Sequence, residues 1–334
     1  MKLNAIFQNG CILQANKPIY IFGTGAGEAT VTLNGATAEA TAEGDKWVVE
    51  LPAMDYGGPY ELSVTLNGEA VTLSDVWLGD VYLLAGQSNM QLTLASTDYP
   101  KELYRPLPNV RLFSTPRPES NEHFKPEDGW VTSTRENAQY WSALGYMVAS
   151  FLTVRSSHKI GLVECYQGAA AIQTYLPPRA FEQYPEFDLP FNARYEKNPK
   201  YFWNYENSYL YKFHFESIIP YGFAAVLWYQ GESNANKDES VIYDRYLTTL
   251  ITMWREDLRD ADLPFVVVQI ADYVYRADEN WARIQEMQTK VGKEVPHVIT
   301  VPCRDVCENT QIHPAKKSLL ARRMADAVLE LCQG

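Results

Sequence analysis

The sequence predicts an α/β protein: a parallel sheet of about five strands covered by helices, preceded by a small all-β module. In residues 1–75, short runs of alternating apolar and polar residues end in Asn-Gly, a dipeptide typical of hairpin turns. From residue 76, short apolar strands alternate with long amphipathic segments, as in a sheet covered by helices. We therefore expect two units, an accessory module over residues 1–75 and a main domain over residues 76–334.

Two hairpins define the predicted module. Residues 29–33 lead into Asn34-Gly35, and residues 60–66 lead into Asn67-Gly68. Residues 73–80 then run into the first strand of the main sheet without a flexible Gly/Ser linker. We expect the module to pack firmly on the main domain.

The main domain is predicted from apolar strands and helical periodicity. Short runs rich in Val, Ile, Leu and aromatic residues predict strands at residues 80–85, 159–165, 223–229, 265–271 and 297–301. Apolar residues at helical spacing predict helices at residues 138–154, 241–258, 280–291 and 315–331. Residues 170–215 lack periodicity and are dense in Pro, Tyr, Phe and Asn, which indicates a long insertion over one end of the sheet.

Charge and hydropathy exclude several classes of partner. The formal net charge is -12, with no basic cluster, so we expect neither nucleic acid nor a membrane surface as a partner. No run of about 18 apolar residues is present, and the N-terminus lacks the apolar stretch of a secretory peptide. As the sequence stands it predicts a cytoplasmic protein, or a secreted or periplasmic one if a leader has been removed.

The cysteines predict no metal centre. Five of them are scattered along the chain, and none belongs to a His-Cys cluster with zinc spacing. Cys303 and Cys307 are four residues apart, but no second pair accompanies them. We expect reduced, mostly buried thiols, with no metal and no cofactor.

Ser88 is a candidate nucleophile. It follows the strand at residues 80–85 through Gly86, so its hydroxyl should lie at the carboxyl end of a parallel strand, where open sheets bind ligands. A serine at a strand end is usually a helix cap, and position alone favours that role. The other motifs reverse this preference.

A second polar cluster follows another strand. Residues 228–234 read Trp-Tyr-Gln-Gly-Glu-Ser-Asn, an abrupt change from apolar to polar side chains. Acyl transfer needs donors aimed at the oxyanion of its tetrahedral intermediate, and the Gln230 amide is a candidate. Alternatively, Glu232, Ser233 and Asn234 only cap the segment that follows.

His313 is the candidate base. It lies in Ile312-His313-Pro314, after the last predicted strand, and Pro314 suits the first turn of the final helix. Histidine can take a proton from serine and return it to a leaving alcohol near neutral pH.

Gly168 is a weaker candidate. It follows the strand at residues 159–165, where a glycine lets the backbone approach a ligand and can supply a second oxyanion N–H. A tight turn explains it equally well.

Together, residues 86–90 (Gly-Gln-Ser-Asn-Met), 228–234 and 312–314 resemble the sialate O-acetylesterase family of carbohydrate esterases, within the SGNH (GDSL-type) hydrolase superfamily. The resemblance extends into the module and covers nearly the whole chain. It implies a three-layer α/β/α, flavodoxin-like domain and metal-free hydrolysis of acetyl esters on sugars. It also implies Ser88 as nucleophile, His313 as base, and an oxyanion hole made by the Ser88 backbone, Gly168 and Gln230.

One position departs from the superfamily pattern. An Asp usually stands three residues before the catalytic His and orients the imidazole, whereas this sequence has Thr310. Glu232, Glu308 or a backbone carbonyl such as that of Gln311 could substitute, and Asn234 is a further candidate pocket residue. We favour a Ser-His dyad held by a carbonyl.

Three functions remain as alternatives. The leading one is a sialate O-acetylesterase with an acetyl-Ser88 intermediate, and the second is an acetylxylan esterase acting on neutral polysaccharide. A sialate enzyme should offer an arginine to the substrate carboxylate, and Arg179 and Arg194 in the insertion are candidates. The third is an inactive sugar-binding protein, suggested by the missing Asp and by aromatic residues that could stack on sugars, among them Tyr175, Trp203 and Trp228.

Overall fold

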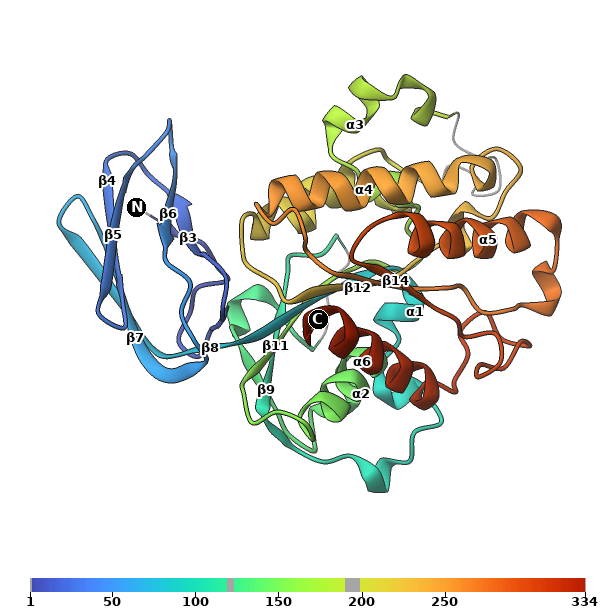
Figure 1. Ribbon diagram of the computed structural model, residues 1–334, viewed down its shortest axis with the longest axis horizontal. Helices are drawn as coiled ribbons and strands as arrows, with labels where there is room; N and C mark the ends of the chain where they lie inside the picture. The colour runs from blue at the N-terminus through green and yellow to red at the C-terminus, as the bar shows by residue number, and fades with distance from the viewer. Residues whose placement is uncertain (1, 119–122, 190–198, 334) are drawn as a thin grey trace.

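In the computed structural model, which describes residues 2–118, 123–189 and 199–333, one sheet continues from the N-terminal strands into the larger part of the molecule. The first strands form a β-rich module beside a larger part in which helices cover both faces of the sheet (Figure 1). This is the mixed α/β architecture that the sequence predicts. Among the residues described, no helix is both long and apolar enough to cross a membrane.

The module is built from short antiparallel strands. β1 (Lys2–Leu3), β3 (Ile19–Thr24) and β6 (Lys46–Leu51) form one sheet, and β4 (Glu28–Leu33), β5 (Ala36–Thr41) and β7 (Gly57–Leu66) pack against it as part of the larger sheet. Both predicted hairpins are present: Asn34 and Asn67 have φ of 47° and 49°, the left-handed conformation that a two-residue turn requires. The alternating burial of β4 and β6 places Val31, Trp47 and Val49 in the module core.

Strand β8 (Glu69–Gly86) connects the module to the larger part. Its first half pairs with β7, and its second half is a central strand of the parallel sheet. β2 (Ile12–Gln14) also pairs with it, opposite Trp77 to Gly79. The predicted division at residue 75 falls inside this uninterrupted strand and stays a prediction.

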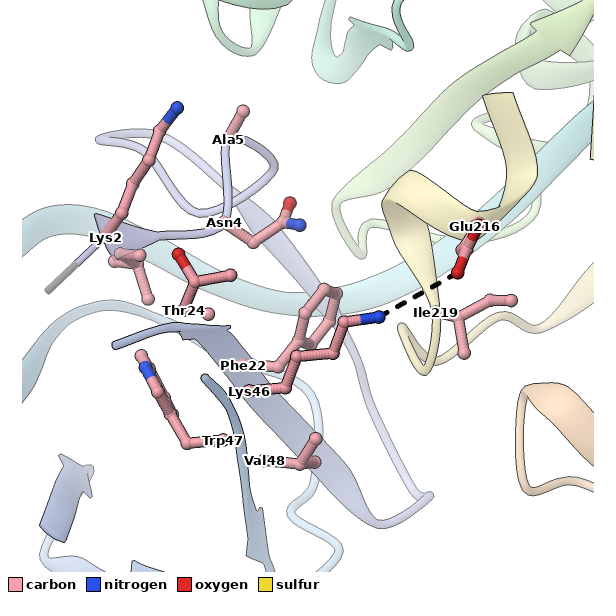
Figure 2. Close-up of a pocket in the computed structure, with 12 residues that line it drawn as sticks. Lys2, Asn4, Ala5, Phe22, Thr24, Lys46, Trp47, Val48, Glu216 and Ile219 are labelled. Atoms are coloured by element: carbon pink, nitrogen blue, oxygen red, sulfur yellow. Dashed lines mark ion pairs between the residues drawn. The ribbon is translucent and has the colours of Figure 1, made fainter. Parts of the chain in front are cut away.

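Side-chain contacts add to the connection. Trp130 Nε1 donates to the Ile6 carbonyl at 2.8 Å, and Lys17 Nζ lies 2.6 Å from Asp260. A groove of about 360 Å³ runs between the two parts, and across it Lys46 Nζ lies 3.8 Å from Glu216 (Figure 2). The module is therefore fixed to the larger part by strand pairing and by side chains.

The main sheet has the order β10-β9-β11-β8-β12-β13-β14, and all of these strands except edge strand β10 are parallel. The strands not yet given are β9 (Leu107–Ser114), β10 (Val131–Ser133), β11 (Ile160–Tyr166), β12 (Ala225–Tyr229), β13 (Phe265–Val268) and β14 (Val298–Val301). All five predicted strands are found. The sequence prediction missed β9, because Pro108, Asn109 and Arg111 interrupt its apolar run, and it also missed the three-residue edge strand β10.

Helices cover both faces of this sheet. α4 (Tyr243–Asp257) and α5 (Glu279–Glu294) lie on one face, and α2 (Ala143–Leu152) and α6 (Ser318–Gln333) lie on the other (Figure 1). The short helices are α1 (Ser88–Gln91) and α3 (Pro178–Gln183). α6 begins at Ser318, so the expectation that Pro314 lies in its first turn is wrong. Residues 302–317 instead form a long loop with several turns, and Pro314 lies within it. The predicted insertion at 170–215 is described except for residues 190–198, and it contains α3 and several single helical turns.

Candidate active site

Three neighbouring strands end in register. Gly86 of β8 lies opposite Tyr166 of β11 and Tyr229 of β12, so the segments that follow all leave the sheet at the same level. Gly86 has a φ of 124°, and a Cβ at this position would lie 2.1 Å from the Tyr229 carbonyl oxygen. Only glycine allows this close approach, which turns the chain directly into α1. The register brings together the three segments that contain Ser88, Gly168 and Gln230.

Ser88 and His313 are in contact. Ser88 is the first residue of α1, and His313 lies in the loop between β14 and α6. The His313 Nε2 atom is 2.8 Å from Ser88 Oγ, within hydrogen-bonding distance. With Nε2 unprotonated, the imidazole accepts the serine hydroxyl proton, which is the arrangement of an activated nucleophile.

The environment of His313 favours the neutral form of its imidazole. Burial lowers the pKa of His313, and the nearby Lys317 ammonium lowers it further. Both effects disfavour the protonated form. The imidazole is therefore available as a base below the usual histidine pKa.

None of the three predicted orienting groups bonds to His313. Within the described chain, the His313 ring makes one hydrogen bond, the contact with Ser88. The Glu308 carboxylate accepts the backbone N–H groups of Ala315 and Lys316. Glu232 Oε1 accepts from Asn89 at 2.6 Å. Glu232, Glu308 and the Gln311 carbonyl are thus wrong as direct partners of Nδ1 in this structure.

The structure does not support Gln230 as an oxyanion donor. Its side chain is fully buried, and Nε2 donates one hydrogen to the Ala170 carbonyl and the other to Asn234 Oδ1, at 3.1 and 2.6 Å. Asn234 is also fully buried, and its Nδ2 donates to Gln173 and Glu239 at 2.8 and 2.9 Å. These amides link the loops by hydrogen bonds. Asn234 therefore does not line a pocket, and Gln230 has no hydrogen left for a substrate.

Gly168 lies beside Ser88. A Cβ at Gly168 would be 3.8 Å from the Ser88 Cβ. Its N–H donates to Gln91 Oε1 at 2.7 Å, and Gln91 is three residues beyond Ser88 in α1. A substrate oxygen that accepts this N–H must replace or share it with the Gln91 amide. The Ser88 N–H belongs to the first turn of α1, where it has no acceptor within the helix.

The other predicted ligand-binding side chains have structural roles. Tyr175 and Trp228 are fully buried, with ring centroids 5.5 Å apart, so both belong to the core, whereas Trp203 is partly buried. Arg179 lies 2.9 Å from Asp257, at the last turn of α4. α4 leads from the carboxyl end of β12 back to the start of β13. That turn therefore lies at the amino-terminal ends of the strands, whereas Ser88 lies at their carboxyl ends. Arg179 is therefore wrong as a carboxylate ligand, and Arg194 lies outside the described residues.

Three residues near the catalytic pair were not predicted. Asn89 follows Ser88 and donates to the Ile312 carbonyl at 2.9 Å, and Lys317 Nζ donates to Asn89 Oδ1 at 2.7 Å. Gln91 occupies the Gly168 N–H. The sequence held one usable signal, which is proximity along the chain: Asn89 and Gln91 lie one and three residues after Ser88, and Lys317 lies four residues after His313. In the part of the chain that is described, no group of three or more His, Cys, Asp or Glu side chains could hold a metal ion.

A serine hydroxyl 2.8 Å from an imidazole, at the carboxyl ends of a parallel sheet, is the arrangement typical of serine hydrolases. The model of the family described as "Carbohydrate esterase, sialic acid-specific acetylesterase" matches residues 78–330. The chain belongs to this family and is an ester hydrolase.

Known relatives and solved structures agree with this assignment. The chain is 25% identical to the human sialate O-acetylesterase, over 95% of this chain and 68% of the human protein. The mouse sialate O-acetylesterase is 26% identical, over 91% and 68% of the two chains. A carbohydrate acetylesterase from Xanthomonas citri has a TM-score of 0.86 with 27% identity, over the whole of this chain and 75% of that one. The likeness to that structure includes the N-terminal module.

Proposed function

We propose that this protein is a carbohydrate O-acetylesterase of the sialate O-acetylesterase type, with Ser88 as nucleophile and His313 as general base and acid. The observation that carries the proposal is the 2.8 Å contact between Ser88 Oγ and His313 Nε2. The family assignment and the sialate O-acetylesterases among its relatives support an acetylated sugar as substrate.

The reaction follows from the geometry of this pair. His313 Nε2 takes the Ser88 proton as Oγ attacks the acetyl carbonyl, which forms a tetrahedral oxyanion. The bond to the sugar oxygen then breaks, and His313 returns the proton to that oxygen, leaving acetyl-Ser88. Water, deprotonated by His313, attacks the acetyl-enzyme, and collapse of the second tetrahedral intermediate releases acetate and restores the serine hydroxyl.

Two backbone donors are proposed for the oxyanion hole. The Ser88 N–H belongs to the first turn of α1, and Gly168 lies next to Ser88. The Ser88 N–H is fixed before the reaction and can stabilise the developing charge without reorganising. For Gly168, the substrate oxygen takes the place that Gln91 Oε1 occupies in the substrate-free protein.

Replacement of the two catalytic side chains tests the proposal. Ser88→Ala and His313→Ala should each reduce the kcat for an activated acetyl ester by at least about 10³-fold, because each removes one half of the nucleophile-base unit. Normal acetate release by Ser88→Ala would refute the proposal. Circular dichroism of both variants provides the check on folding.

The placement of Arg179 favours a second substrate class. Because that side chain is held at the far end of α4, it cannot bind the carboxylate of a sialate positioned at Ser88. A neutral acetylated polysaccharide such as acetylxylan needs no such cation. Because the family assignment and the sialate O-acetylesterases among its relatives outweigh this single observation, acetate release from 9-O-acetylated sialic acid should exceed release from acetylated xylose oligomers. The reverse order would assign the neutral substrate. An inactive sugar-binding role is disfavoured by the intact Ser88-His313 contact and by the family assignment.

A further inference from the structure

The buried side-chain amide of Asn89, the residue after Ser88, lies between the Lys317 and Glu232 side chains. Asn89 Oδ1 accepts a hydrogen bond from Lys317 Nζ at 2.7 Å. Its Nδ2 donates to Glu232 Oε1 at 2.6 Å and to the Ile312 carbonyl at 2.9 Å. The amide oxygen and both amide hydrogens of Asn89 therefore each take part in a hydrogen bond.

The charges fix the orientation of the amide. If the Asn89 side chain flipped, its Nδ2 hydrogens would face the Lys317 ammonium, and its oxygen would face the Glu232 carboxylate. Both contacts would be repulsive. In the observed orientation both are charge-assisted hydrogen bonds, which are stronger than bonds between neutral groups. The pair Lys317 and Glu232 thus keeps an Asn89 donor aimed at the Ile312 carbonyl.

This cluster is costly to bury. Lys317 is fully buried, Asn89 is 2% exposed and Glu232 is 5% exposed. Burial lowers the pKa of Lys317 and raises the pKa of Glu232, and within the described residues Glu232 Oε2 has no hydrogen-bond partner. Unsatisfied charged oxygens in a protein interior are unfavourable, so stability alone does not explain the arrangement.

The hydrogen bond from Asn89 joins the two catalytic segments. Asn89 is the neighbour of Ser88 in the chain, and Ile312 is the neighbour of His313. A bond between the Asn89 side chain and the Ile312 carbonyl therefore restrains the separation of nucleophile and base. The His313 ring itself has no partner other than Ser88 among the described residues, so its position depends on its backbone.

We propose that Asn89, oriented by Lys317 and Glu232, is the positioning residue that takes the place of the missing orienting carboxylate. It holds the backbone of His313 so that Nε2 stays in hydrogen-bonding distance of Ser88 Oγ. The inference rests on the proposed catalytic roles of Ser88 and His313.

Lys317 has a second effect on the same base. It is the charged group that acts on the His313 ring, since Ser88 is neutral and no carboxylate of the described chain bonds to the imidazole. Lys317 is itself faced by Glu232 from the loop after β12, by Cys303, Cys307 and Glu308 from the loop after β14, and by the Tyr229 ring at 5.1 Å. Removing its cation should therefore make His313 easier to protonate.

The test uses three variants and one control, assayed with an activated acetyl ester. Asn89→Asp is nearly isosteric and keeps the acceptor for Lys317, but it loses both donors. We expect Asn89→Asp and Asn89→Ala to lower kcat by about 10- to 100-fold with little change in KM, because misplaced reacting groups slow the chemical step. Lys317→Met should lower kcat and also move the acid limb of the kcat/KM profile to higher pH. Lys316→Met removes a neighbouring exposed charge and should leave both unchanged.

The outcomes separate this inference from the proposed function. If Ser88→Ala retains activity, the proposed function fails. If Ser88→Ala is inactive but Asn89→Asp and Lys317→Met keep the wild-type kcat and pH profile, the positioning role is overturned. The rate at which a phosphonate ester modifies Ser88 gives a second readout, independent of sugar binding, and it should fall in parallel with kcat. Should Lys317→Met not fold, the two Asn89 variants decide the question alone.

Discussion

No carboxylate of the described residues bonds to the His313 imidazole, and this should determine how the proposed base responds to pH. In the usual triad an acid stabilises the imidazolium and raises the pKa of the histidine. Here, burial and the Lys317 ammonium lower the pKa of His313. The base is therefore weaker, but it stays unprotonated in more acidic solution.

We predict that activity persists below the usual histidine pKa of about 6.5. A general base acts in its neutral form, and a lowered pKa keeps that form populated as the pH falls. The kcat/KM for an activated acetyl ester should lose half its value at a pH below 6.5. A midpoint at or above 6.5 would show that an anion acts on His313, in contradiction to the structure.

Glu308 organises the loop that contains His313, and we expect it to take no part in proton transfer. Its carboxylate accepts the N–H groups of Ala315 and Lys316, just after His313. Glu308→Gln keeps one acceptor oxygen and should retain most of the turnover, whereas His313→Ala should lose nearly all of it. Steady-state kinetics of the two variants side by side will check this, and comparable losses would make Glu308 a member of the catalytic unit.

At the level of elements, the sequence predicts strands and hairpins better than it predicts side-chain networks. Asn34-Gly35 and Asn67-Gly68 were placed correctly because the left-handed turn is a local property of those residues. β9 was missed because Arg111 lies within it, paired with Asp75 at 2.8 Å from a distant segment. A local pattern cannot reveal such a partner.

The candidate site shows the same difference between local patterns, which the sequence reveals, and contacts that only the fold creates. Ser88 and His313 could be predicted as a pair because strand ends and motif order are visible in the chain, and the structure places the two side chains in contact. The structure does not support the role assigned to Gln230, and the sequence could not show this because its hydrogen bonds to Ala170 and Asn234 depend on how two loops meet. Asn89 and Lys317 are 228 residues apart, and only the fold joins them.

The single-turn helix at Tyr211–Phe215 contains a buried histidine that should make stability depend on pH. His214 is fully buried, and burial, followed by the charge of Arg117, lowers its pKa to about 3. Below about pH 6.5 the unfolded chain binds a proton at this residue and the folded chain does not. Acidification from pH 6.5 toward pH 3 should therefore cost up to about 1.4 kcal/mol of folding free energy per pH unit from this group.

Substitution of His214 isolates this contribution. His214→Gln should be less stable than the wild type at pH 7 because it disturbs a packed site, but its stability should fall less steeply between pH 6 and pH 4. Urea unfolding at several pH values measures both slopes. Equal slopes in the two proteins would mean that other groups account for acid sensitivity.

For the whole molecule, strand β8 makes the module and the catalytic part mechanically continuous. The same strand pairs with β7 in the module and with β11 and β12 beside the nucleophile. Trp130 and Lys17 add contacts across the boundary. A disturbance in the module should therefore reach the strand that carries Ser88.

We predict that the module and the active site unfold in one transition. Leu33 is fully buried in the module and lies opposite Leu62 of β7, far along the chain from the catalytic residues. Leu33→Ala should cost about 2–5 kcal/mol through lost burial and the cavity that remains. Because β8 couples the two parts, esterase activity and tryptophan fluorescence should be lost at the same, lowered temperature. Val154→Ala, at an exposed position, is a control that should leave the midpoint unchanged. If Leu33→Ala showed an early fluorescence change while activity survived to the wild-type temperature, the module would be an independently folding unit, and β8 would not transmit its stability to the site.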